Sequence, residues 1–146
     1  MAVTFRPIRS GDEPFLSQVY ASTRLDELAV TDWNDEQKAA FLQMQFSAQH
    51  TFYQENYTST DFLIVPQDDI PVGRLYVARW KDEIRIVDIA LLPAYRGTGI
   101  GTAMLRDLLA EADAAGKPVR IHVERDNPAL RLYQRLGFEM IEDKGV

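Results

Sequence analysis

The spacing of apolar side chains near the amino terminus predicts a strand followed by two helices. Residues 3–8 are expected to form an edge strand, because their proline has no N–H to donate to a neighbouring strand. Residues 10–28 begin with polar helix-start residues and then place apolar side chains three and four positions apart, which is typical of an amphipathic helix. The same spacing over residues 33–50, after a cap at Asn34 or Asp32, predicts a second helix.

Three β-rich runs follow, at residues 62–65, 71–80 and 83–92. Residues 66–69 are turn formers and separate the first two runs, and Lys81 and Asp82 separate the second from the third. Connections this short favour antiparallel pairing of successive strands. The sequence therefore predicts an antiparallel meander.

The last third of the chain predicts a helix, a strand, a second helix and a final strand. Apolar residues recur with a period of 3.6 over residues 100–112, and a glycine and a proline then end the helix. Residues 119–124 alternate like a strand, and the intervening helix implies that this strand is parallel to the one before it. Asn127 is expected to cap the last helix, and residues 138–141 to form the final strand.

These elements together predict an α/β (α+β) fold, with a mixed sheet of about six strands flanked by four helices. A chain of 146 residues is expected to build one core, so we predict a single domain over residues 1–146.

Composition excludes several classes of function. The chain has 16 Lys and Arg against 22 Asp and Glu, a net charge of −6, so a general nucleic-acid-binding surface is not expected. With no cysteine, disulfides, thiolate zinc sites and a thiol nucleophile are excluded, and His50 alone supports no metal site. Apolar runs are far too short to span a membrane, and charges occur throughout the first thirty residues. We expect a cytoplasmic protein with neither a membrane nor a metal partner.

Residues 95–105, YRGTGIGTAML, place three glycines at alternate positions before an amphipathic helix. Their spacing fits neither the dinucleotide fingerprint, which requires a glycine where Thr102 stands, nor a P-loop, which requires a lysine there. Backbone N–H groups of such a loop and of the first helical turn can converge on a pyrophosphate, with Arg96 adding a full positive charge. The alternative is that the glycines only form a tight turn and allow close packing of the helix on the sheet.

LLPAYRGTGIGTAML, followed by HVERDNPALRLYQRLGFEM, resembles the GCN5-related N-acetyltransferase (GNAT) family. The two blocks cover about residues 84–141. The first resembles the acetyl-CoA pyrophosphate motif of the family, and the second resembles its strand and helix ending in LY-x-x-x-GF.

The resemblance implies a sheet that is splayed at its centre, where two parallel strands separate and acetyl-CoA lies between them. Residues Ile89, Ala90, Leu91 and Leu92 would supply a strand edge to the pantetheine arm. The pyrophosphate cradle would be formed by Arg96, Gly97, Thr98, Gly99, Ile100, Gly101 and Thr102. Asn127 and Ala129 would contact the pantetheine arm, although Asn127 lies six residues before Tyr133 where seven is commoner in the family, so Asp126 is an alternative.

The resemblance also implies that Tyr133 lies near the CoA sulfur as a general acid. A tyrosine of ordinary pKa near 10 would transfer its proton uphill to a thiolate of pKa near 8.5, by roughly 2 kcal/mol. Either Tyr133 is acidified, or it mainly donates a hydrogen bond to the departing thiolate.

The acceptor amine must lose a proton, and the candidate bases are Asp88, Glu83, Glu124 and His122. Asp88 is preferred, because an acid inside the apolar run IVDIALL requires a reason; a structural hydrogen-bonding role is the alternative. Acceptor contacts are expected from the first two helices and the segment between them, a region that offers Tyr20, Arg24, Asp26, Glu27, Trp33, Phe41, Gln45, Gln49, Tyr53 and Tyr57.

We therefore predict an acetyl-CoA-dependent N-acetyltransferase that acts on an unidentified amine of a small molecule or peptide by direct transfer. The alternatives are an acyl-CoA sensor without turnover and an interaction protein whose glycines are structural. Only eight residues follow Phe138, whereas many family members have a further strand, so a homodimer that covers the edge of the sheet is also predicted.

Overall fold

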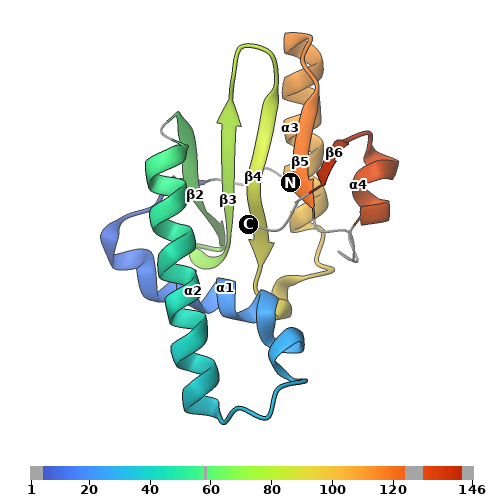
Figure 1. The fold of residues 1–146 in the computed structure, drawn as a ribbon. Coiled ribbons are helices and arrows are strands. Elements are labelled where there is room, and N and C mark those ends of the chain that lie inside the picture. The colour runs from blue at the N-terminus through green and yellow to red at the C-terminus, as the bar shows by residue number, and fades with distance from the viewer. Residues whose placement is uncertain (1–4, 58, 124–129, 143–146) are drawn as a thin grey trace.

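The computed structural model describes residues 5–57, 59–123 and 130–142. Its centre is a mixed sheet of six strands in the order β1-β2-β3-β4-β5-β6 (Figure 1). The strands are β1 (Arg6–Pro7), β2 (Thr60–Gln67), β3 (Ile70–Arg79), β4 (Ile84–Leu91), β5 (Val119–Val123) and β6 (Glu139–Glu142). Strands β1 to β4 pair antiparallel, whereas β4 with β5 and β5 with β6 pair parallel. The predicted meander and the predicted parallel crossover are both confirmed.

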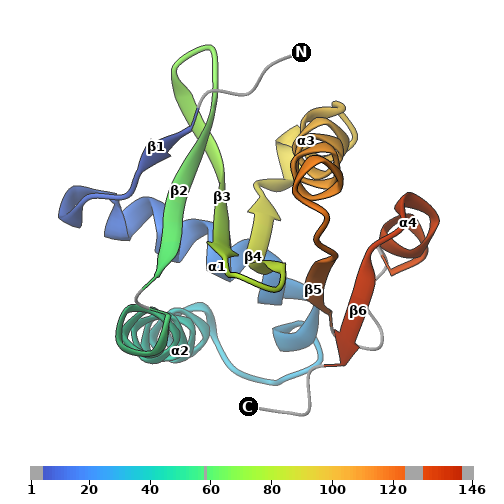
Figure 2. The ribbon, with the colours of Figure 1, turned by 90° about the horizontal axis from the view of Figure 1, so that it is seen from above.

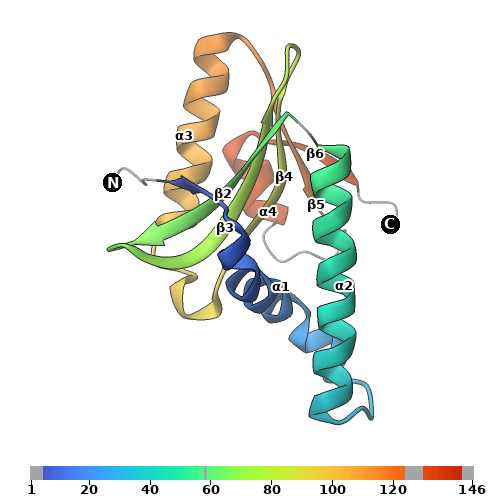
Figure 3. The same cartoon turned by 90° about the vertical axis from the view of Figure 1, so that its left-hand side faces the viewer.

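Four α-helices among the described residues cover the two faces of the sheet: α1 (Glu13–Leu28), α2 (Asp35–Asn56), α3 (Ile100–Ala115) and α4 (Leu130–Leu136). Helix α3 lies on the opposite face from α1 and α2, as Figures 2 and 3 show. The class predicted from the sequence, about six strands flanked by four helices, is confirmed. None of the described helices is long and apolar enough to span a membrane.

The helices begin and end where local chemistry dictates. Asn34 caps α2, because its side chain accepts a hydrogen bond from the backbone N–H of Gln37, whose own side chain accepts one from the N–H of Asn34. Gly116 ends α3 in a left-handed conformation with φ +67°, which glycine adopts without strain. Pro14 stands in the first turn of α1, where a missing N–H costs nothing.

Several boundaries differ from the prediction, among them those of β1 (Arg6–Pro7 rather than residues 3–8), of α2 and of the first hairpin. Helix α2 continues to Asn56 rather than ending near His50, because Tyr53 in its last turns packs edge-on against Tyr76 of β3 with 5.7 Å between ring centroids. Residues 66 and 67, predicted as part of a turn, belong to β2 and pair with Pro71 and Ile70. The actual turn is Asp68–Asp69, both with positive φ, as a type I′ hairpin turn requires.

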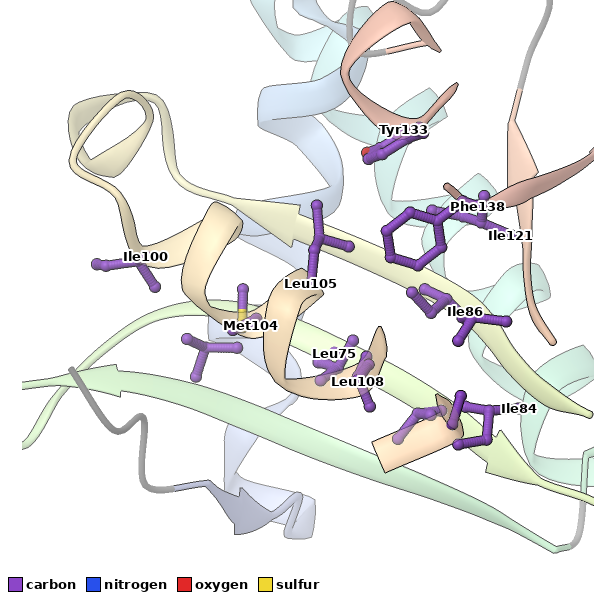
Figure 4. Packing of buried hydrophobic residues seen from close by; sticks show 14 of the residues in the cluster. Leu75, Ile84, Ile86, Ile100, Met104, Leu105, Leu108, Ile121, Tyr133 and Phe138 are labelled. Carbon is purple, nitrogen blue, oxygen red and sulfur yellow. The ribbon is translucent and has the colours of Figure 1, made fainter. Parts of the chain in front are cut away.

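The main core lies between the sheet and α3 (Figure 4). Ile100, Met104, Leu105 and Leu108 of α3 pack on Leu75, Ile84, Ile86 and Ile121 of the sheet, all at most 5% exposed. A second cluster joins α1 and α2 to the other face, around Leu16, Phe46 and Ile64. Because both faces of the central strands are covered, any polar side chain there is removed from water.

Strand β6 is the outermost strand of the described sheet, next to β5. The described residues contain no strand beyond it. The prediction of a homodimer that covers this edge stays a prediction.

Candidate active site

Strands β4 and β5 are paired over only part of the length of β4. Their register runs from Ile84 opposite Val119 to Ile86 opposite Ile121, and β4 then continues to Leu91 with no partner on that side among the residues that the structure describes. On its other side, β4 remains paired with β3 up to Leu91. The carboxyl-terminal half of β4 therefore presents one unpaired edge in the middle of the sheet.

A β-bulge at Val87 accompanies this separation. Ile86 lies opposite Val77 and Asp88 lies opposite Tyr76, so β4 holds one residue more than β3 at this point. Such a bulge bends its strand and increases its twist, which carries β4 away from β5. It also changes the alternation of side chains, so that Val87 and Asp88 both face α2 while Ile86 and Ile89 face α3.

The unpaired edge carries the backbone groups of Ile89 and Leu91. The N–H of Leu92 donates to Val72 of β3, so the groups of Ala90 and Leu92 point to β3 and those of the alternate residues point to the open side. The Arg96 side chain confirms this direction, because its Nε donates to the Leu91 carbonyl oxygen at 3.1 Å. Of the four strand residues predicted to hold the cofactor, these two offer it hydrogen bonds.

The predicted phosphate cradle lies directly after this edge. A 3-10 turn over Pro93–Tyr95 leads into Gly97 and Gly99, which have φ of +75° and +91°. A Cβ built on either glycine would meet no atom of the described residues within 4 Å, so the space in front of the loop is open. Thr98 is held by its hydroxyl, which donates to the carbonyl oxygen of Tyr95 at 2.7 Å.

Gly99 is the amino-terminal cap of α3, and as a glycine it offers no side chain to the first N–H groups of the helix. Those N–H groups belong to Ile100, Gly101 and Thr102. Ile100 points its side chain into the core at 2% exposure, so only its backbone is available. A Cβ on Gly101 would lie 3.7 Å from a side-chain carbon of Leu91, at ordinary contact distance, so the packing of α3 on β4 does not by itself require a glycine here. The residues present fit a pyrophosphate: open backbone donors, a helix amino terminus and an exposed arginine.

Tyr133 lies on α4, 8% exposed, with its ring edge-on to Phe138 at 6.1 Å between centroids (Figure 4). Burial raises the pKa of Tyr133, and the negative charge of Asp88 raises it further. Of the two roles that the sequence left open, this direction favours a neutral hydrogen-bond donor over an acidified tyrosine.

Asp88 is engaged by a side chain that the sequence analysis missed. Arg74 of β3 donates from Nη2 to Oδ2 of Asp88 at 2.7 Å and from Nε to Oδ1 at 3.3 Å, and Tyr53 of α2 donates to Oδ2 at 3.4 Å. Arg74 is 3% exposed and also donates to Oε1 of Gln49 at 3.0 Å. Arg74 stands in the apolar run PVGRLYVA, just as Asp88 stands in IVDIALL. A charged residue inside an apolar strand requires a partner, so the argument that selected Asp88 could also have identified Arg74.

The other predicted residues are distributed as follows. Glu83 stands before the amino-terminal end of β4, where it pairs with Arg85 and Arg120, far along the strand from Leu91. Tyr20, Gln49 and Tyr53, predicted to contact the acceptor, lie with Arg74 on the α1 and α2 face. Glu124, Asp126, Asn127 and Ala129 lie outside the described residues, and so does the side chain of His122. The roles predicted for these five residues stay predictions.

Comparison with known proteins identifies the family. Residues 23–138 match the Acetyltransferase (GNAT) family, and the chain belongs to it. It is 32% identical over 118 residues to mycothiol acetyltransferase of Corynebacterium glutamicum (strain R), covering 79% of this chain and 39% of that protein. It is 34% identical over 107 residues to L-2,4-diaminobutyric acid acetyltransferase of Vibrio cholerae, covering 70% and 62%. The chain thus spans less than two thirds of the length of each of these relatives.

Solved structures share the fold. The PaiA N-acetyltransferase of Thermoplasma acidophilum, crystallised with coenzyme A, superposes with a TM-score of 0.67 at 19% identity, covering 99% of this chain and 94% of that one. An acetyltransferase of Thermus thermophilus gives a TM-score of 0.66 at 18% identity, covering 99% and 92%. At this level of identity the likeness concerns the fold.

Proposed function

We propose that the protein is an acetyl-CoA-dependent N-acetyltransferase that moves the acetyl group directly to a primary amine of a small molecule or peptide. The observation that carries this proposal is the unpaired edge of β4 at Ile89 and Leu91, which leads directly into the glycine loop of α3. The names of the related acetyltransferases and the coenzyme A bound to the Thermoplasma protein support the donor.

On the donor side, the backbone N–H groups of residues 97–102 and the Arg96 guanidinium would hold the pyrophosphate. The backbone of Ile89 and the carbonyl oxygen of Leu91 would pair with the amide groups of the pantetheine arm, which leaves the Leu91 N–H for the acetyl group. These residues supply neutral donors and one positive charge to a doubly charged group, and the open space before Gly99 lets the backbone approach it.

In the transfer, the amine lone pair forms a C–N bond to the acetyl carbon, the C–S bond breaks, the nitrogen loses a proton and the sulfur gains one. We assign the Leu91 N–H to the developing oxyanion, because it points into the space beside the unpaired edge. We assign the Tyr133 hydroxyl to the departing sulfur as a hydrogen-bond donor. Asp88 orients the amine, a role for which its fixed position on Arg74 is suited.

The proposal is tested by release of free thiol from acetyl-CoA across a panel of amines. Tyr133→Phe keeps the ring packing on Phe138 and removes only the hydroxyl. We expect kcat to fall by about 100-fold, with the KM for acetyl-CoA within about twofold of the parent. Tight CoA binding without transfer to any amine would instead identify an acyl-CoA sensor.

A further inference from the structure

Gly73 of β3 faces the part of β4 that carries the unpaired edge. It is buried, and it stands opposite Leu91 in the register of the two strands. A Cβ added to Gly73 would overlap the carbonyl oxygen of Ala90 and would lie 3.1 Å from the Cα of Leu91, closer than such atoms normally pack. Both atoms belong to the backbone, so the rotation of a side chain does not relieve the overlap. The close approach of the two strands therefore requires a glycine at this position.

Strand β3 is held in place on its other side by β2. Val65 of β2 stands opposite Gly73 and is fully buried in the main core. A side chain at position 73 would therefore displace the Ala90–Leu91 segment of β4 rather than β3. This displacement would carry β4 away from β3, and with it the backbone groups of Ile89 and Leu91 that form the unpaired edge.

Leu91 connects this edge to the glycine loop in two ways. Its carbonyl oxygen accepts a hydrogen bond from Nε of Arg96 at 3.1 Å. Its Cδ2 lies 2.7 Å from the position of a Cβ on Gly73, and its Cδ1 lies 3.7 Å from that of a Cβ on Gly101. The Leu91 side chain thus lies between a glycine of β3 and a glycine in the first turn of α3. A displacement of Leu91 would reach both the strand edge and the phosphate cradle.

We propose, on the basis of the N-acetyltransferase function above, that Gly73 is a positioning residue for the acyl-CoA donor. Because Gly73 lets β4 pass close to β3, it sets where the backbone groups of Ile89 and Leu91 lie relative to the cradle at the start of α3. The pantetheine arm and the pyrophosphate are covalently joined, so both binding segments must stand at the correct separation to be occupied together. Gly73 acts on this separation through Leu91.

Gly73→Ala adds one methyl group at this point, and calorimetry with CoA measures the effect. We expect the Kd for CoA to rise by at least about tenfold, which corresponds to the loss of two ordinary backbone hydrogen bonds. Ala78→Val is the matched control, because it overfills a fully buried position of the same strand, opposite Arg85, where β4 is paired with β5. It should lower the Tm to a similar extent and leave the Kd within about twofold.

Hydrogen exchange in the protein without CoA shows whether β4 has moved. The N–H of Leu92 donates to the carbonyl oxygen of Val72 at 2.8 Å, directly beside Gly73, so this bond should weaken in Gly73→Ala. We expect the Leu92 amide to exchange at least about tenfold faster than in the parent, with no selective change at Leu92 in Ala78→Val. Unchanged exchange at Leu92 in a folded Gly73→Ala protein would contradict the displacement.

Leu91→Ala tests the same connection without adding an atom, so it applies even if Gly73→Ala does not fold. The variant keeps the backbone groups of the edge and removes the side chain between Gly73 and Gly101. We expect the Kd for CoA to rise by at least about threefold, because the edge and the cradle are then held together less firmly. Leu109→Ala removes an equal, partly buried side chain elsewhere on α3 and should leave the Kd within about twofold.

The outcomes separate this inference from the proposed function. An unchanged Kd for CoA in a folded Gly73→Ala protein, or an equal rise in Gly73→Ala and Ala78→Val, would overturn the role of Gly73 and leave the proposed function intact. If Gly73→Ala does not fold, an unchanged Kd in Leu91→Ala would overturn it in the same way. A parent protein that does not bind CoA would overturn the proposed function itself.

Discussion

The two ends of β4 carry similar chemistry and have opposite effects on the sheet. At the first end, Glu83 is 7% exposed and binds Arg85 and Arg120 at 2.8 and 3.1 Å. Near the second end, Asp88 binds Arg74 at 2.7 Å. We refer to these regions as the closed end and the open end of β4.

The difference lies in where the arginines originate. Arg85 and Arg120 lie opposite each other on β4 and β5, so their shared carboxylate holds these two strands together. Arg74 belongs to β3 and its second partner Gln49 belongs to α2, so this pair holds β4 to the elements on the side away from β5. An ion pair therefore closes the sheet at one end and, together with the bulge at Val87, leaves it open at the other.

The largest expected effect comes from a side chain added at the open end. Gly99→Val would place a branched side chain in the open space before the loop and in a left-handed conformation, and we expect no measurable CoA binding by calorimetry. Gly116→Val is the matched control, because it strains the far end of the same helix by a similar amount, about 1 to 3 kcal/mol. It should lower the Tm while leaving the Kd for CoA within about twofold. Normal binding by Gly99→Val would place the cradle elsewhere.

Removing the acid at each end should show that the two ion pairs contribute differently to the free energy of unfolding. Asp88→Asn leaves the buried Arg74 without a counter-ion, and we expect urea unfolding to show a loss of about 3 to 5 kcal/mol. Glu83→Gln should cost about 1 to 2 kcal/mol, because Arg120 has a side chain that is 37% exposed and reaches water. Equal losses for the two variants would contradict this difference between the ends.

The double variant Arg74→Met/Asp88→Asn then separates structure from function. It removes both charges, so most of the stability should return. Transfer activity should stay low, because the group that orients the amine is still missing. Recovery of activity together with stability would show that the pair is purely structural.

Arg96→Ala should weaken CoA binding by about 1.5 to 3 kcal/mol, because one charged donor to the pyrophosphate is lost. Arg106→Ala removes the same charge from an exposed position on α3 and serves as the control for general electrostatic attraction. Calorimetry at two salt concentrations should show the larger loss for Arg96 at both. Equal losses for the two variants would show that Arg96 acts only through the net charge of the protein and makes no specific contact with the pyrophosphate.

The smallest effect concerns pH at the closed end. The Arg85 side chain, and then Arg120, hold the pKa of Glu83 below its usual range. A lowered carboxyl pKa contributes stability above the unfolded value near 4.3, and this stability is lost as the pH falls through the folded value. Acid unfolding of Glu83→Gln should accordingly depend less on pH below about 4.5 than that of the parent. Identical acid profiles would show that this carboxylate is not linked to folding.

Much of the fold could be predicted because local patterns agree with the global arrangement. The periodicity of α3, its glycine and the strand after it predicted a parallel crossover, and the structure has one. The extension of α2 to Asn56 was missed, since it depends on Tyr53 packing against a strand distant in sequence. Local helix propensity does not reflect contacts between residues that are distant in sequence.

The cradle and the open edge could be anticipated from spacing and resemblance, whereas the surroundings of Asp88 could not. Alternation alone would place Asp88 on the same face as Ile86, under α3, because the two residues are two positions apart. Only the bulge turns it toward Arg74 and Tyr53. Whether a strand contains a bulge depends on its pairing, which the sequence of the strand by itself does not specify.

Because of the bulge at Val87, β4 should tolerate a substitution at this position better than a deletion. A substitution at Val87 alters one side chain in an aromatic cluster and leaves the order of faces intact. A deletion of the same residue would instead remove the bulge: regular alternation would keep Asp88 toward α2 and Ile89 toward α3, but β4 would lose the bend that carries it away from β5. Length at this point of the chain should therefore vary far less than composition among sequences that keep this site.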